Sequence, residues 1–73
     1  MQGAMPISMA TVGTAYTIKK ISGNTEVRSH LKSMGFNEGT EVKLITQLYG
    51  DVIIHVKESR VAINKDQARH ILV

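Results

Sequence analysis

Residues 31–42, LKSMGFNEGTEV, decide the fold, because a helical pattern ends within them at one glycine and a strand pattern begins after a second. Before this stretch, apolar residues at Val27, Leu31 and Met34 follow the i, i+4, i+7 spacing of one helix face. This spacing predicts an amphipathic helix over residues 25–34.

The two glycines predict how the helix ends and how the next strand begins. Gly35 falls just after the helix C-cap, where glycine adopts the left-handed conformation at least cost, and Phe36 can then fold back onto Leu31. Gly39 offers a second position for a positive φ, suited to a type II turn. Alternation of apolar and polar residues then predicts a strand over residues 40–48.

The start of the helix is encoded as well. The side chain of Asn24 or Thr25 can accept a free backbone N–H of the first turn. Glu26 lies where the helix dipole favours a negative charge. Local residues therefore predict both ends of the helix.

The remaining strands are predicted by alternating apolar residues between turn signals. Residues 15–21 read as one strand of about six residues. Residues 52–57 pair with the strand 40–48 in a hairpin around Tyr49-Gly50-Asp51, and residues 60–63 follow a turn at Glu58-Ser59. A three-stranded meander results.

The end of the chain is expected to close the sheet. Asn64 and Gln67 have the spacing of a capping box, which predicts one helical turn with Ala68 facing inward. Ile71 and Val73 can then complete a sheet with the first strand. We therefore predict a mainly β fold with one or two short helices, a small SH3-like β-barrel whose five strands close and whose helix covers one open end.

The first residues show neither a helical nor a strand period. We expect residues 1–11 to be a flexible lead-in, of which Gln2 to Met5 look like a tag remnant, and residues 12–73 to be one domain. At 73 residues the chain has room for a single small core.

Composition excludes several classes of function. The chain has no cysteine, which excludes disulfides, thiolate metal sites and thiol nucleophiles. No serine lies in a G-x-S-x-G elbow and no Gly-Lys-Ser/Thr follows the glycines, so we expect neither a hydrolase nor a GTPase. Without a run of 18 apolar residues or a signal peptide, a cytosolic location is expected. The net charge of +3 favours an acidic partner, anionic lipid or nucleic acid over a basic partner, and it does not choose among these three.

Histidines give only weak metal candidates. Glu26 and His30 are four residues apart on the predicted helix, and a carboxylate with an imidazole suits a divalent first-row metal. Two ligands do not make a site, and an exposed pair of this kind is more often a solvated contact of about 0.3 kcal/mol. His55 and His70 do not visibly converge with them. We therefore expect no metal site and no cofactor.

Residues of the central stretch carry a family resemblance. Leu31, Gly35, Phe36, Gly39 and Val42, with the later Val61-Ala-Ile63 and Ala68-x-x-Ile71-x-Val73, resemble the FeoA family of small ferrous iron transport proteins over residues 12–73. Glu38 departs from the pattern, because the family usually has proline before the second glycine. The resemblance implies an SH3-like barrel and a non-enzymatic, cytosolic accessory protein that docks on the membrane permease FeoB and so lies at the inner face of the membrane.

A docking surface is predicted on the hairpin. If Val52, Ile54 and Val56 face inward, the outer face gathers apolar side chains, and the candidate partner-binding residues are Gly35, Phe36, Ile45, Leu48, Tyr49 and Ile53. The alternative is a small-barrel nucleic-acid binder, against which the scattered basic residues and the three aromatic residues argue. An exposed barrel edge also leaves weak homo-oligomerisation open.

Overall fold

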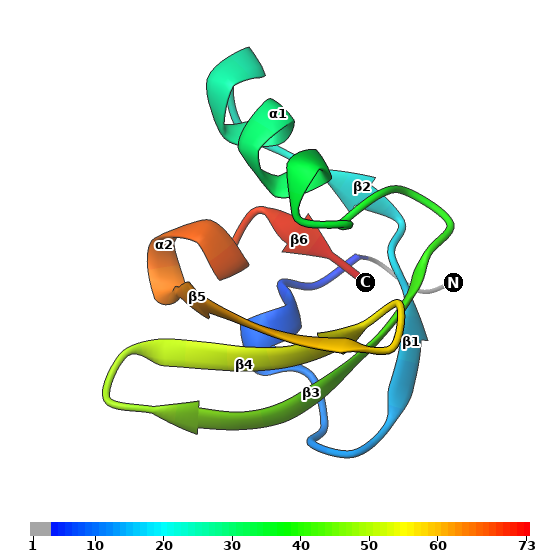
Figure 1. Cartoon of the computed structure of the whole chain (residues 1–73), viewed down its shortest axis with the longest axis vertical. Coiled ribbons are helices and arrows are strands. Elements are labelled where there is room, and N and C mark those ends of the chain that lie inside the picture. Colours follow the sequence, from blue (N-terminus) through cyan, green and yellow to red (C-terminus); the bar gives the residue numbers. More distant parts are fainter. Residues whose placement is uncertain (1–3) are drawn as a thin grey trace.

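The computed structural model describes residues 4–73, and its strands outnumber its helices. Figure 1 shows the four-stranded sheet on one side of the molecule and both α-helices on the other. In chain order the elements are η1 (Ile7–Met9), β1 (Ala15–Thr17), β2 (Lys20–Ile21), α1 (Thr25–Ser33), β3 (Glu41–Leu48), β4 (Asp51–Val56), β5 (Ser59–Asn64), α2 (Lys65–Ala68) and β6 (Ile71–Leu72).

The strands form two antiparallel sheets. Four strands pair in the order β1-β3-β4-β5, and β2 pairs separately with β6 (Figure 1). The meander β3-β4-β5 and the pairing of the last strand with the end of the first predicted strand are confirmed. The prediction of one closed barrel is wrong, because no hydrogen-bonded ladder joins the two sheets within residues 4–73.

The single strand predicted at residues 15–21 is interrupted for a structural reason. The Ile18 N–H donates to the Thr40 carbonyl at 2.9 Å, whereas the next N–H, of Lys19, donates to the Leu72 carbonyl at 2.7 Å. Consecutive residues thus bond to different sheets. The segment splits into β1, which pairs with β3, and β2, which pairs with β6.

Helix α1 begins and ends as its sequence predicts. Asn24 is the N-cap, and its side-chain oxygen accepts the Val27 N–H at 2.9 Å. At the other end the Gly35 N–H donates to the Lys32 carbonyl at 3.0 Å, and Phe36 N–H donates to the Leu31 carbonyl at 3.1 Å. These two bonds, with Gly35 at φ 99°, are a Schellman motif.

The turn that leads from α1 to β3 is formed by residues 37–40. The Thr40 N–H donates to the Asn37 carbonyl at 3.0 Å, and Gly39 has φ 87° at the third position, as a type II turn requires. The Gly39 N–H also donates to the Ile18 carbonyl at 2.8 Å. This bond ties the turn to the point where the chain passes between the two sheets.

Helix α2 carries the predicted capping box. The Asn64 side chain accepts the Gln67 N–H at 2.8 Å, and the Gln67 side chain accepts the Asn64 N–H at 3.3 Å. Ala68 is buried, as predicted.

The core draws on both sheets, both helices and the N-terminal segment. Inward-facing residues of β3 and β4 alternate as predicted, with Val42, Leu44, Val52, Ile54 and Val56 all buried. The full set of buried apolar residues in the described chain is Ile7, Ile18, Ile21, Leu31, Phe36, Val42, Leu44, Val52, Ile54, Val56, Ile63, Ala68, Ile71 and Val73.

The described part of the expected lead-in is packed against this core. Met5 and Val73 exchange two backbone hydrogen bonds of 2.8 and 3.0 Å, Pro6 bridges to Leu72, and Ile7 is fully buried. Residues 5–10 therefore differ from the flexible lead-in that we expected, because pairing along β6 supplies the order that no local period encodes. Of the predicted tag remnant at residues 2–5, residues 2 and 3 lie outside the described residues.

Candidate docking surface

The turn between β3 and β4 presents its first residue to solvent. Leu48 pairs with Asp51 across a two-residue loop, and the loop residues Tyr49 and Gly50 have φ of 51° and 96°. Two positive φ values define a type I′ turn, whose first position favours Asn, Asp or Gly. A tyrosine at this position is therefore unusual, and its side chain is fully exposed.

A bulge in β3 decides which side chains reach the outer face of the hairpin. Leu44 pairs with Ile54 and Thr46 pairs with Ile53, so that Ile45 is the extra residue. Because a bulge shifts the alternation by one position, Leu48 turns to the face opposite the buried Leu44. Without the bulge, even-numbered Leu48 would have pointed inward.

We call the outer-face residues Ile45, Leu48, Tyr49 and Ile53 the hairpin face. On the same face, the cross-strand partners of Leu48 and Ile53 are the polar residues Asp51 and Thr46. Leu48 is 53% exposed, and Ile45 and Ile53 are half-buried. Neither isoleucine belongs to the core cluster or packs against it. The sequence-based placement of Ile53 and Ile45 on the outer side of the sheet is in accord with this geometry.

Basic residues flank the hairpin face on one side. Lys43, His55 and Arg60 are cross-strand neighbours in one row of the sheet, next to the row that holds Ile53 and Ala62. All three flanking side chains are exposed. The hairpin face therefore has basic side chains along one side.

The structure places two predicted contact residues elsewhere. Phe36 is 0% exposed, so its side chain belongs to the core and cannot lie on a contact surface. Its place after Gly35 in the Schellman motif explains the burial, because that position commonly packs back onto the helix. Gly35 is half-buried, and a Cβ there would touch the Lys57 side chain at 3.6 Å.

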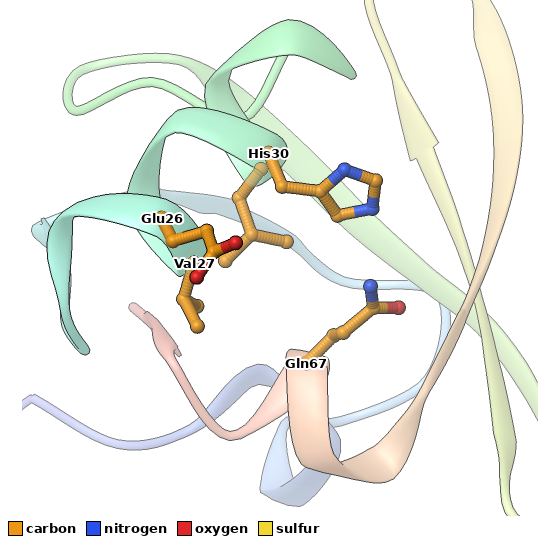
Figure 2. A pocket seen from close by; sticks show the side chains of 5 residues that line it. Glu26, Val27, His30 and Gln67 are labelled. Carbon is orange, nitrogen blue, oxygen red and sulfur yellow. The ribbon is translucent and has the colours of Figure 1, made fainter.

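The candidate metal pair lies on α1 beside a small hollow. Glu26 and His30, with Val27, Leu31 and Gln67, line a cavity of about 230 Å³ between α1 and α2. Figure 2 shows the His30 ring and the Gln67 amide extending toward the same opening from the two helices. Within residues 4–73, no three His, Asp or Glu side chains are grouped so that they could hold a metal ion. The Glu26–His30 pair therefore lacks a third ligand.

Ser22 and His70 form a side-chain contact of the kind found in hydrolases. Ser22 Oγ lies 3.0 Å from Nδ1 of His70, and the Ser22 N–H donates to the His70 carbonyl at 2.8 Å. Both residues are half-buried where the loop after β2 meets the residue before β6. Hydrolysis would also require an acid that orients the imidazole and donors for an oxyanion. The contact joins the two segments at one end of the small sheet, next to the pair Ile21–Ile71.

The fold is that of a small, mainly β, SH3-like domain with two α-helices. No helix in the described part of the chain is long and apolar enough to cross a membrane. The chain belongs to the FeoA family, because the family model of the FeoA domain matches residues 5–73. The resemblance found in the sequence is confirmed, and the matched range includes the N-terminal residues that pack along β6.

Relatives place the chain among ferrous iron transport proteins. An Fe(2+) transport protein A of Methanocaldococcus jannaschii is 37% identical over 68 residues, which are 93% of this chain and 83% of that protein. The crystal structure of a protein described as iron uptake regulatory protein, FeoA, is 29% identical and covers 97% of this chain and 96% of its own, with a TM-score of 0.88.

More distant structures share the fold. Stenotrophomonas maltophilia FeoA, described as an SH3 domain protein and crystallised with zinc, is 20% identical with a TM-score of 0.79, over 93% of this chain and 87% of its own. A manganese-dependent transcriptional repressor is 16% identical with a TM-score of 0.86, over 96% of this chain and 40% of the repressor. At these identities the likeness concerns the fold alone.

The outward backbone groups of Arg60 and Ala62 on β5 depend on the exact position of the preceding turn. The sequence predicts that turn at Glu58-Ser59, whereas the observed loop is Lys57-Glu58, one residue earlier. Because hydrogen bonding alternates along an antiparallel pair, this shift of one residue exchanges the outward and the bonded residues, so the sequence could not identify them.

Proposed function

We propose that this protein is a non-enzymatic, cytosolic accessory factor of ferrous iron uptake that docks on a FeoB-type membrane permease and modulates its transport or assembly. The hairpin face is the docking surface. Family membership supports the process, and the arrangement of Leu48, Tyr49, Ile45 and Ile53 supports the mode of action.

The observation that carries the proposal is the conformation and exposure of Tyr49. Its φ of 51° is costly for a residue with a Cβ, and its exposure of 106% means that no contact with the rest of residues 4–73 offsets the cost. The whole side chain is therefore accessible to a partner. Tyrosine is also enriched among residues that dominate binding energy.

The surroundings of Tyr49 fit a protein partner. Leu48 and Ile53 supply apolar area at the centre, and Lys43, His55 and Arg60 supply the polar border that excludes water from such a centre. A nucleic-acid strand would instead require several stacking aromatics. Of the three aromatic residues, Phe36 is buried and Tyr16 is half-buried.

The test is capture of the detergent-solubilised ferrous iron permease from the same cell. Wild type is compared with Ile53→Asp and Tyr49→Ala at two salt concentrations. We expect both variants to lose capture and wild type to lose little at the higher salt. Ser29→Asp is the matched control, since it adds the same charge on the exposed face of α1.

Two results would overturn the proposal. The first is equal capture by wild type and both hairpin variants, which would place docking on another surface. The second is absence of capture together with salt-sensitive retention on nucleic acid, which would favour the alternative, because counterion release makes nucleic-acid binding fall steeply with salt. Circular dichroism of each variant confirms that it is folded.

A further inference from the structure

Strand β5 ends the four-stranded sheet and has an unpaired edge. Among the described residues its only strand partner is β4, to which it is joined by the two-residue loop Lys57-Glu58. In such a hairpin the pair that closes the loop, Val56 and Ser59, exchanges both backbone hydrogen bonds. The register then alternates, so that Val61 and Ile63 also bond to β4.

The backbone groups of the intervening residues point outward. In the pairs His55–Arg60 and Ile53–Ala62, each N–H and C=O is directed away from the other strand. Asn64 is the third residue of this set, and its N–H is taken by the Gln67 side chain at 3.3 Å. For Arg60 and Ala62, no backbone bond to another segment is found within residues 4–73. The capping box thus closes one end of the edge and leaves two positions open.

We propose that an extended segment of the partner adds to this edge as a fifth strand, and that this segment alternates acidic with apolar side chains. The inference rests on the proposed docking function and specifies what the partner contributes. Strand addition draws its affinity from main-chain hydrogen bonds and its specificity from the alternate side chains. Two N–H and two C=O groups, those of Arg60 and Ala62, are available for it.

Basic residues on the outer face of the sheet next to β5 favour acidic side chains on an added strand. Arg60 is exposed on β5, and its cross-strand neighbours His55 and Lys43 continue a row of basic groups across the sheet. A carboxylate on an added strand beside Arg60 would lie at the end of this row. Glu41 and Glu58 also border it, on the side of the Lys57-Glu58 turn.

Apolar residues on the core side of β5 favour apolar side chains on the same side of an added strand. Val61 and Ile63 of β5 face the core side, and α2 begins directly after β5. The hollow between α1 and α2 has Val27, Leu31 and Gln67 in its lining, and Gln67 is three residues beyond the end of β5. In Figure 2, β5 rises from α2 across the opening from α1. Apolar side chains of an added strand would extend into this space.

A second copy of the chain fits the edge less well. Each copy carries a net charge of +3 and would bring its own Arg60 to the contact. Like charges at this range disfavour pairing. An acidic segment would instead place an opposite charge beside Arg60.

The decisive variant is Ala62→Pro. Proline removes the outward N–H and places its ring on the edge, but leaves the bonds of Val61 and Ile63 to β4 intact. Capture of the permease should fall at least tenfold. Ala62→Val is the matched control, because it keeps the N–H and suits a strand. Hydrogen exchange of the Val61 and Ile63 amides verifies that β5 remains paired in both variants.

Amide exchange of the wild type gives a readout at the edge itself. The amides of Arg60 and Ala62 should exchange quickly in the free protein and become protected by the permease, and also by the synthetic peptide acetyl-Thr-Val-Glu-Val-Glu-Val-Thr-amide. The same peptide with lysine in place of glutamate should protect neither amide. Arg60→Glu should reverse this preference.

The outcomes separate this inference from the function on which it rests. Protection by the acidic peptide without capture of the permease would refute the docking function and keep the edge as a strand-binding site. Capture without protection of Arg60 and Ala62, and unchanged by Ala62→Pro, would refute strand addition and keep docking. Protection that rises with the concentration of the free protein would identify a second copy as the occupant and overturn the proposal.

Discussion

Replacing Tyr49 with asparagine should make the protein more stable and less able to dock. Tyr49 has φ 51° in the first position of a type I′ turn. A left-handed conformation costs an ordinary residue about 1–2 kcal/mol, and asparagine avoids part of this cost through local hydrogen bonds of its short side chain. Because the tyrosine side chain is fully exposed, the substitution sacrifices no buried apolar area. We expect a net gain of about 0.5–1 kcal/mol.

Thermal unfolding followed by circular dichroism measures this gain. For a domain of this size, 1 kcal/mol corresponds to about 4–8 °C in the melting temperature, so Tyr49→Asn should melt about 2–8 °C higher than wild type. Tyr49→Phe is the control, because it keeps both the strained backbone and the aromatic ring. That variant should melt as wild type does and should still capture the permease.

A melting temperature of Tyr49→Asn at or below that of wild type would contradict strain at Tyr49, since the tyrosine would then stabilise the turn through contacts that its exposure excludes. A variant that is more stable and still captures the permease as well as wild type would contradict the role of Tyr49 in docking. The turn would then be suboptimal for reasons unrelated to the hairpin face.

Four further predictions address the core, the second turn, the capping box and the metal pair. Phe36→Ala should lower the free energy of unfolding by about 3–5 kcal/mol, a large part of the roughly 4–11 kcal/mol expected for 73 residues, as measured by chemical denaturation. A loss below about 1 kcal/mol would contradict the burial of the ring. Glu58→Gly should stabilise the protein by about 0.5 kcal/mol and so raise its melting temperature slightly, because Glu58 has φ 65°. A lower melting temperature would contradict strain in that turn. Asn64→Ala should lower the urea midpoint by the equivalent of about 1 kcal/mol, and an unchanged midpoint would mean that the capping box adds no stability. Zinc or ferrous iron should leave the melting temperature unchanged, because Glu26 and His30 have no third ligand, whereas an increase abolished by His30→Ala would establish a site.

Features encoded by neighbouring residues could be predicted from the sequence. The N-cap of α1, its end at Gly35 and the capping box of α2 each depend on residues within six positions of one another, and each has its expected hydrogen bonds. The inward side chains of β3 and β4 followed from alternation alone. These signals are local, so the rest of the fold is not needed to interpret them.

Features that depend on distant partners could not be predicted. Nothing near Ile7 indicates burial, because its order comes from the pairing of Met5 with Val73 at the other end of the chain. The bulge at Ile45 likewise has no glycine or other local mark, although it decides where Leu48 points. The candidate contact residues Ile45, Leu48, Tyr49 and Ile53 thus lie on the outer face of the hairpin, whereas the Phe36 side chain belongs to the core. Contact of the outer-face residues with a partner stays a prediction.

The departure from a closed barrel is also what creates the candidate edge. Closure of the sheet would have paired β5 with another strand and left no free N–H groups. Instead, Ile18 bonds to Thr40 while Lys19 bonds to Leu72, so β6 is engaged by β2 and by Met5 on its two sides. No strand in the described chain remains to pair with β5. A partner that supplies one would extend the four-stranded sheet next to the hairpin face, so that both proposed contacts lie on one continuous sheet.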